Sequence, residues 1–174
     1  MMKYQRFKPN TLVIRRFFNT HKNSTRAQLI WAIKALGVQD LWNIPKAELT
    51  LTYKPTGQQI LFRGMDDPQS ITSITVEEGY LCWVWIEEAF QITSEDDFDK
   101  LDMSIRGSLP KELFHQFILT FNPWSEKHWL KRRFFDNPDN DTLALTTNYT
   151  MNEFLSEGDI RLFEKMKQRF PKRY

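Results

Sequence analysis

Residues 81–89 read Leu-Cys-Trp-Val-Trp-Ile-Glu-Glu-Ala, and this stretch decides the fold of the chain. An uninterrupted apolar run of this length predicts a buried strand. The run ends abruptly in two adjacent carboxylates, Glu87 and Glu88. In open α/β sheets, ligands bind beyond the carboxyl ends of the strands. The sequence therefore places both carboxylates where such a sheet would hold a ligand.

Five other short apolar runs are also predicted to be strands. They are Thr11–Ile14, Leu49–Tyr53, Gln59–Phe62, Gln116–Phe121 and Thr142–Thr146. The segment Pro55-Thr56-Gly57 separates the second of these runs from the third. Proline fixes φ and glycine permits positive φ, so this segment predicts a turn and the two runs a hairpin.

Helical patterns lie between the strands. Ser24 is positioned to cap a helix whose apolar residues recur at helical spacing, and Gly37 is positioned to end it. Two more helices are predicted at Ser125–Phe135 and near Asp159–Arg169. This alternation predicts an α/β fold with a mainly parallel sheet flanked by helices on both faces. No Gly/Ser linker divides the chain, so we expect one domain over residues 1–174. Residues 1–135 would form its sheet and helices, and residues 136–174 a C-terminal subdomain segment.

Composition excludes several classes of protein. The chain has 174 residues, 41% of them hydrophobic, which is enough for a folded core. Its 24 basic and 22 acidic residues are too evenly balanced to indicate nucleic-acid binding by themselves. The single cysteine, Cys82, lies in an apolar run and indicates a small buried side chain. No signal peptide or membrane span is evident, so we expect a soluble intracellular protein.

The two carboxylates and a second strand end suggest a nucleotide site. One carboxylate, Glu87, would hold Mg²⁺ directly or through water, while Glu88 would polarise an attacking water. Thr120 and Asn122 follow a second buried strand about thirty residues later, where an amide can bond a γ-phosphate or the attacking water. The alternatives are a solvated glutamate-rich turn and an Asn-Pro turn that needs no ligand.

Charged side chains elsewhere leave more than one interpretation open. Four arginines near predicted strand or loop ends could stabilise transferred charge or form ordinary ion pairs: Arg15, Arg16, Arg63 and Arg106. Of these we retain Arg63 and Arg106 as arginine-finger candidates. The run from Trp124 to Arg133 could contact a DNA backbone, or form an amphipathic helix with Trp129, Leu130 and Phe134 inward. The acidic residues 95–102 fit a two-metal nuclease less well than a solvated helix start, and the three scattered histidines give no zinc pattern.

Several of these segments resemble the large subunits of phage terminases. The resemblance rests on residues 85–89, 99–107, 119–123 and 125–129, and it extends to 13–16, Ser24, 27–29, 57–67, 147–149, Asn152 and 154–155. It implies an ASCE-type P-loop NTPase fold, in an ATPase domain that drives double-stranded DNA into a procapsid and precedes a nuclease domain. Glu87 would then be the magnesium-associated carboxylate, Glu88 the catalytic one, and Thr120–Asn122 the coupling motif.

The resemblance also implies Mg²⁺ and ATP as cofactors, the portal protein and small terminase subunit as partners, and the cytoplasm of the bacterial host as location. The chain departs from the family in one respect. None of its six glycines precedes a lysine, so it has no Gly-Lys-Ser/Thr phosphate loop. Residues 1–3 fall where the helix after that loop would end, and residue 174 falls before a nuclease domain.

We therefore expect a fold that is incomplete at the N-terminus and a chain that is inactive alone. An unpaired sheet edge beside Leu81–Ile86 or its neighbours would favour self-association. The alternative is a non-catalytic remnant, or a binding or assembly module that complements another terminase piece.

Overall fold

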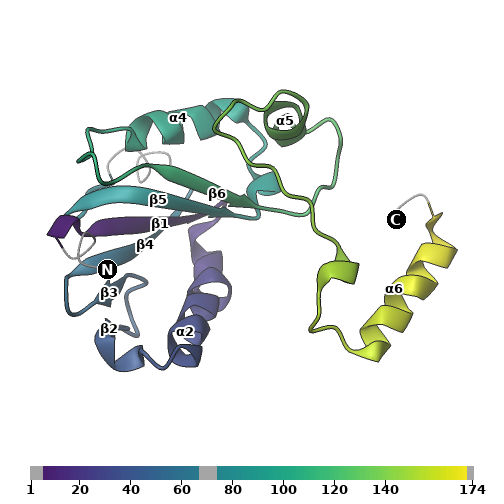
Figure 1. Cartoon of the computed structure of the whole chain (residues 1–174), viewed down its shortest axis with the longest axis horizontal. Coiled ribbons are helices and arrows are strands. Elements are labelled where there is room, and N and C mark those ends of the chain that lie inside the picture. The colour runs from purple at the N-terminus through teal and green to yellow at the C-terminus, as the bar shows by residue number, and fades with distance from the viewer. Residues whose placement is uncertain (1–5, 67–73, 172–174) are drawn as a thin grey trace. The chain divides into compact units, whose positions relative to one another are not determined.

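The computed structural model describes residues 6–66 and 74–171 (Figure 1). The expectations that involve residues 1–3, Asp67 and residues 172–174 lie outside them. The chain divides into two compact units, Met1–Arg132 and Arg133–Tyr174. The first unit holds the sheet, and the second holds the last long helix.

The described part of the first unit is built on a six-stranded sheet in the order β2-β3-β4-β1-β5-β6. The strands are β1 (Pro9–Arg15), β2 (Trp42–Asn43), β3 (Leu51–Tyr53), β4 (Gln58–Gly64), β5 (Tyr80–Glu87) and β6 (Gln116–Thr120). Strand β1 pairs in parallel with β4 and β5, and β5 pairs in parallel with β6. Strand β3 is antiparallel to β2 and β4. The predicted α/β fold with a mainly parallel sheet is confirmed, and so is the β3–β4 hairpin, whose turn has Gly57 at φ +75°.

Helices cover both faces of the sheet (Figure 1). Helix α2 (Thr25–Ala35) lies on one face and α4 (Glu95–Ile105) on the other. Shorter turns connect the elements: η1 (Phe18–Asn23), η2 (Gln39–Leu41), η3 (Ala89–Gln91) and α5 (Trp129–Lys131). The π-helical turn η4 (Arg132–Asp136), η5 (Tyr149–Met151) and α6 (Glu157–Arg169) follow. Because α4 leads from the end of β5 to the start of β6, its own C-terminus lies toward the amino ends of the strands.

The core reflects the alternation of side chains along each strand. Val13 packs with Ile33 of α2, Leu51 and Phe62, all of them buried. On α4, the buried residues recur at helical spacing: Phe98, Leu101, Asp102 and Ile105. The expected acidic helix start is confirmed, since α4 begins at Glu95 and the Ser94 hydroxyl accepts a hydrogen bond from the Asp97 N–H. Cys82 is buried as expected, and burial raises its pKa to about 11.

Three helix and strand predictions need correction. Residues 142–146 form no strand, and Leu143 and Leu145 are 81% and 74% exposed. Their alternating pattern suits a strand, but no partner strand satisfies their backbone groups. The helix predicted at 125–135 begins only at Trp129 and passes into a π-turn, although Trp129 and Leu130 are buried as predicted. Ser24 precedes α2 but does not cap it, because its hydroxyl donates to the Thr20 carbonyl instead.

The outer strand β6 also differs from prediction. An unpaired edge was expected beside Leu81–Ile86 or its neighbours; β5 itself has neighbours on both sides in the described sheet. The outer strands of the described sheet are β2 and β6, and β6, the neighbour of β5, has Ile118 47% exposed. The expectation that helices flank the sheet on both faces therefore fails at residues 116–121. An edge strand is buried only where another element reaches it, and α4 reaches one face of β6 through the contact of Phe98 with Phe117.

The second unit is small, and its main element is α6. A capping box begins this helix: the Ser156 hydroxyl accepts from the Asp159 N–H, and the Asp159 carboxylate accepts from the Ser156 N–H. The helix predicted near 159–169 is therefore confirmed and starts two residues earlier. Tyr149 stacks on Phe163 with ring centres 4.8 Å apart. Among the described residues, no helix is both long enough and apolar enough to cross a membrane.

Candidate functional site

The structure brings the ends of β5 and β6 together. In their parallel pairing, Glu87 stands opposite Thr120. Both residues therefore lie at the carboxyl edge of the sheet, where open α/β sheets bind ligands. The sequence alone placed each residue at the end of a strand, and the register shows that these two strands are neighbours.

Glu87 is held by a basic residue of the next strand. Ile14 pairs with Ile86, so Arg15 and Glu87 are the next residues at the same level of β1 and β5. The Arg15 Nε lies 2.7 Å from the Glu87 Oε2, and the two side chains are 13% and 20% exposed. Burial raises the pKa of the Glu87 carboxyl, the Arg15 charge opposes that shift, and the Glu88 charge adds to it. Arg15 thus favours the ionised carboxylate.

The Glu87 carboxylate retains a capacity for further bonding. Its Oε2 is buried beside the Arg15 Nε, without an aligned hydrogen bond between them, and no hydrogen bond of the described residues engages its Oε1. Mg²⁺ is typically bound by one or two carboxylates together with water and substrate phosphates. No group of three metal-ligating side chains occurs in the described residues. Within the described residues, Glu87 could therefore supply only part of a magnesium ligand set, with phosphate and water as the remaining ligands.

Glu88 turns the chain away from the strand. Its backbone is left-handed, with φ 55° and ψ 45°. A residue other than glycine in this region costs about 1–3 kcal/mol, and such residues cluster at functional sites. The Glu88 carbonyl accepts a hydrogen bond from the Gln91 N–H at 2.9 Å, which closes η3. This turn takes Glu88 out of the strand alternation, so the two adjacent carboxylates have different surroundings.

At the end of β6, the Thr120 side chain has a hydrogen-bond partner and the Asn122 side chain is exposed to solvent. The Thr120 hydroxyl oxygen accepts a hydrogen bond from the Trp85 indole N–H at 2.9 Å. A hydroxyl that accepts one bond keeps its own proton to donate. Asn122 lies two residues beyond the strand and is exposed. Both side chains can therefore donate a hydrogen bond at the carboxyl ends of the strands.

The segment after Asn122 docks on the turn after Glu88. The Trp129 indole N–H donates to the Ile92 carbonyl at 2.6 Å. The His128 ring stacks on the Phe90 ring with centres 4.4 Å apart and an interplanar angle of 29°. An inward-facing Trp129 was one of the two interpretations that the sequence left open. Its partner was not predictable, because contacts between segments this far apart leave no local signal.

The other arginines singled out in the sequence lie at different positions relative to Glu87. The Arg63 Nη1 donates to the Phe62 carbonyl at 2.8 Å, and Arg63 pairs with Ile14, two strands away from Glu87. Arg106 binds the Asp102 carboxylate at 2.5 and 3.0 Å, and that hydrogen bond and charge raise the pKa of Arg106. Since Arg106 follows the C-terminus of α4, it lies away from the carboxyl edge. The Arg16 Nη1 donates to the Gln91 carbonyl at 2.7 Å.

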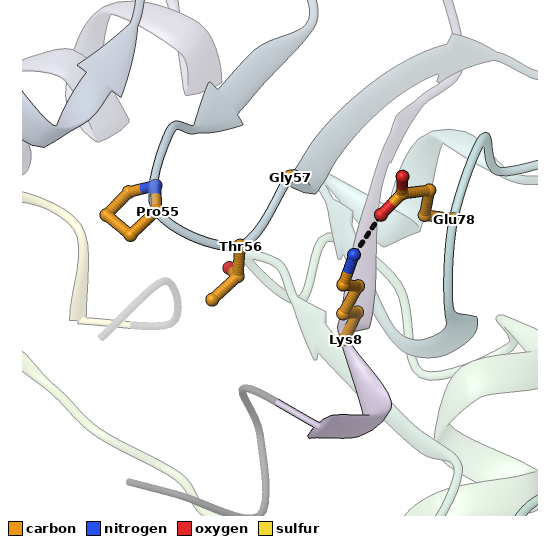
Figure 2. Close-up of a pocket in the computed structure, with 5 residues that line it drawn as sticks. All are labelled: Lys8, Pro55, Thr56, Gly57 and Glu78. Carbon is orange, nitrogen blue, oxygen red and sulfur yellow. Dashed lines mark hydrogen bonds and ion pairs between the residues drawn. The ribbon is translucent and has the colours of Figure 1, made fainter.

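A separate hollow of about 470 Å³ lies at the opposite end of the sheet. Figure 2 shows its lining, in which Lys8 forms an ion pair with Glu78 across from the β3–β4 turn at Pro55, Thr56 and Gly57. Lys8, Gly57 and Glu78 come just before β1, β4 and β5. The hollow is therefore at the amino ends of the strands and is not part of the carboxylate site.

Comparison with known proteins decides the family. Residues 1–174 match the family described as phage terminase large subunit. The chain belongs to this family. It is 36% identical over 167 residues to the terminase large subunit of Bacillus phage SPP1, in a match that covers 94% of this chain and 39% of that protein. It is 32% identical over 135 residues to the PBSX phage terminase large subunit of Bacillus subtilis (strain 168), in a match that covers 78% of this chain and 29% of that protein.

Solved terminase structures have the same fold. The large terminase of a thermophilic bacteriophage matches with a TM-score of 0.70 and 16% identity, covering 91% of this chain and 37% of that one. A second structure of that protein, in complex with ADP, matches with a TM-score of 0.68 at the same identity and coverage. The fold is thus the P-loop NTPase type of large terminases, as predicted. The chain spans less than half the length of these terminase relatives.

Proposed function

We propose that this chain is the part of an ATP-driven DNA-packaging motor that carries the two catalytic carboxylates and the coupling segment. The observation that carries the proposal is the adjacent pair Glu87 and Glu88 at a strand end, opposite Thr120 of the neighbouring strand. The relatives from SPP1 and PBSX are terminase large subunits, and the large terminase of the thermophilic bacteriophage binds ADP. These similarities support ATP as the nucleotide and DNA packaging as the task.

The two carboxylates have separate roles in this proposal. Glu87, oriented by Arg15, holds Mg²⁺, and Glu88 accepts a proton from the water that attacks the γ-phosphate. When bound, Mg²⁺ would neutralise the charge of the phosphates. The different surroundings of the two residues suit this division, because Glu87 is paired with a cation and Glu88 is turned out of the strand.

Further phosphate ligands come from outside these residues. None of the six glycines in the sequence precedes a lysine, so a phosphate loop of the Gly-Lys-Ser/Thr type must be supplied by another segment. The same observation favours the second candidate function, a non-catalytic module that complements another terminase piece. Arg63 and Arg106 stay candidates for an arginine finger, and Arg106 could act only on the site of a neighbouring subunit.

Coupling to DNA movement would start at β6. In this proposal Thr120 and Asn122 bond the γ-phosphate or the attacking water, which is supported by the pairing of Thr120 with Glu87. The segment that follows them is docked on the turn after Glu88. Loss of the γ-phosphate would then affect both the segment after Asn122 and the turn after Glu88. By analogy with the family, we propose double-stranded DNA as the substrate moved, the portal protein and small terminase subunit as partners, and the host cytoplasm as the place of action.

The test uses a full-length terminase large subunit that contains this segment. We expect Glu88→Gln to bind Mg²⁺-ATP with little change and to lose turnover by about 10²- to 10⁴-fold, since general-base catalysis contributes that much. Glu112→Gln, an exposed acid before β6, is the control for a lost carboxylate charge and should keep normal turnover. Equal losses of binding and turnover in Glu88→Gln would contradict the assignment of Glu88, and a wild-type protein without ATPase activity would contradict the function itself.

A further inference from the structure

The guanidinium of Arg15 joins three elements around Glu87. Its Nε lies 2.7 Å from the Glu87 Oε2, and its Nη1 donates to the Ser24 hydroxyl at 2.6 Å. Ser24 in turn donates to the Thr20 carbonyl at 2.8 Å, immediately before α2. The Arg15 side chain is only 13% exposed. It is therefore fixed at one end by β5 and at the other by the junction of η1 and α2.

This arrangement explains why Ser24 does not cap α2. Its hydroxyl oxygen accepts from Arg15 and its proton is donated to the Thr20 carbonyl, and this pair of bonds orients the hydroxyl away from the first amides of the helix. A serine just before a helix normally accepts from the helix backbone. Here that interaction is replaced by one that orients an arginine, and the arginine contacts a carboxylate of the site.

We propose that Arg15 is a positioning residue that fixes the Glu87 carboxylate for Mg²⁺, and that Ser24 fixes Arg15. The inference rests on the proposed function of Glu87 as the magnesium-side carboxylate. Arg15 contacts neither nucleotide nor metal in this scheme. It acts by holding the Glu87 Oε2, which leaves the Oε1 available to a metal ion.

An arginine is suited to this task and a lysine only in part. The planar guanidinium can contact a carboxylate and a hydroxyl at once in a fixed geometry, whereas an ammonium offers a charge without that geometry. Removing a group that orients a metal ligand typically costs about 10- to 100-fold in metal affinity or activity. Arg15→Gln should therefore weaken magnesium binding by about that factor, and Arg15→Lys should recover part of it.

The experiment compares four variants of a full-length terminase large subunit that contains this segment: Arg15→Gln, Arg15→Lys, Ser24→Ala and Lys22→Gln. Binding of Mg²⁺ is measured by calorimetric titration in the presence of a non-hydrolysable ATP analogue, and turnover is measured separately. Lys22 is exposed in η1, so Lys22→Gln removes a nearby positive charge without touching Glu87. We expect the loss of magnesium affinity to be largest in Arg15→Gln, smaller in Ser24→Ala and absent in Lys22→Gln.

A double-variant comparison separates positioning from general stability. If Arg15 acts through Glu87, adding Arg15→Gln to a Glu87→Gln protein should cause no further loss of magnesium affinity. The melting temperature without nucleotide shows whether each variant that loses magnesium affinity is still folded. Unchanged magnesium affinity in a folded Arg15→Gln protein, or fully additive losses, would overturn the inference. An inactive wild-type protein would instead count against the proposed function.

Discussion

Trp129 donates its indole N–H to the carbonyl oxygen of Ile92 over 2.6 Å. This bond links two segments that leave neighbouring strands, one after Glu88 and the other after Asn122. The Trp129 ring also packs near Phe98 of α4, with centres 5.2 Å apart. The segments after Glu88 and Asn122 are therefore linked beyond the sheet by this bond, in addition to the pairing of β5 with β6 within it.

The first prediction concerns this bond. Trp129→Phe keeps an aromatic ring in place but leaves the buried Ile92 carbonyl without its donor. An unsatisfied buried acceptor costs about 1–3 kcal/mol, so we expect the free energy of unfolding to fall by about that amount. Urea denaturation measures it. Trp124→Phe is the matched control, because Trp124 is 76% exposed and its replacement should change stability little. Equal effects of the two changes would show that the bond contributes nothing.

The second prediction is a pH dependence that originates at His21. This fully buried residue lies with its Nε2 2.8 Å from the Arg63 carbonyl and its Nδ1 2.8 Å from the Thr25 hydroxyl. The carbonyl can only accept, so Nε2 carries the proton and Nδ1 accepts from Thr25. Burial lowers the pKa of His21; the bond to Arg63 opposes that shift, the Arg15 charge adds to it and the Asp66 charge opposes it.

The sign of this effect follows from proton linkage. The unfolded His21 binds protons below a pH of about 6.5, whereas the folded residue resists them to lower pH. The unfolded state then carries more protons, so the folded state should lose stability as the pH falls from about 6.5 toward the lowered folded value. His21→Gln should be less stable at neutral pH but should have a flatter stability profile between pH 7 and about 5. Parallel profiles for the two proteins would place the pH dependence elsewhere.

The local sequence patterns predicted the individual strands better than their order in the sheet. Five of six predicted strands exist because apolar runs and turn residues act over a few positions. Residues 142–146 show the same alternation, yet they form no strand, since the pattern does not reveal whether a partner is present. The strand order, and with it which neighbour of Leu81–Ile86 is the outer strand, depends on pairings over long distances in the sequence.

The same limit applies to the site. Glu87, Glu88 and Thr120 were predictable because each follows an apolar run. The ion pair of Arg15 with Glu87 depends on the parallel register of β1 and β5, which no short motif encodes. Ser24 was predicted to cap α2 because serine before a helix usually does, but its hydroxyl is engaged by Arg15 and Thr20. Side chains with two plausible partners were therefore the least predictable ones.

The third prediction is that the 174 residues tested alone show no measurable ATP turnover. Glu87 and Glu88 cannot anchor a triphosphate without the backbone amides and lysine of a phosphate loop. A sensitive phosphate-release assay with and without Mg²⁺ provides the measurement. Turnover that disappears in Glu88→Gln would contradict the prediction, because it would require phosphate ligands that we have not recognised among these residues.

The last prediction concerns the outer edge of β6. This strand pairs with β5 on one side, and in the described part of the chain no strand pairs with the other side. Its Ile118 is 47% exposed and lies opposite Trp85 in the pairing. An unpaired edge with apolar side chains is a template for association, and an added lysine is a common protection against it. We expect the 174 residues tested alone to self-associate, and Ile118→Lys to reduce that association.

Light scattering and thermal melts on the purified 174-residue chain measure the effect. Leu143→Lys is the matched control, because Leu143 is 81% exposed in the second unit and the change adds the same charge far along the chain from β6. It should leave the association nearly unchanged. A peptide that carries the phosphate-loop strand of a terminase relative should compete for the edge and raise the melting temperature, because it supplies the missing backbone partners. A monodisperse monomer that melts cooperatively, with a melting temperature that the peptide does not change, would show that the edge of β6 is protected in another way.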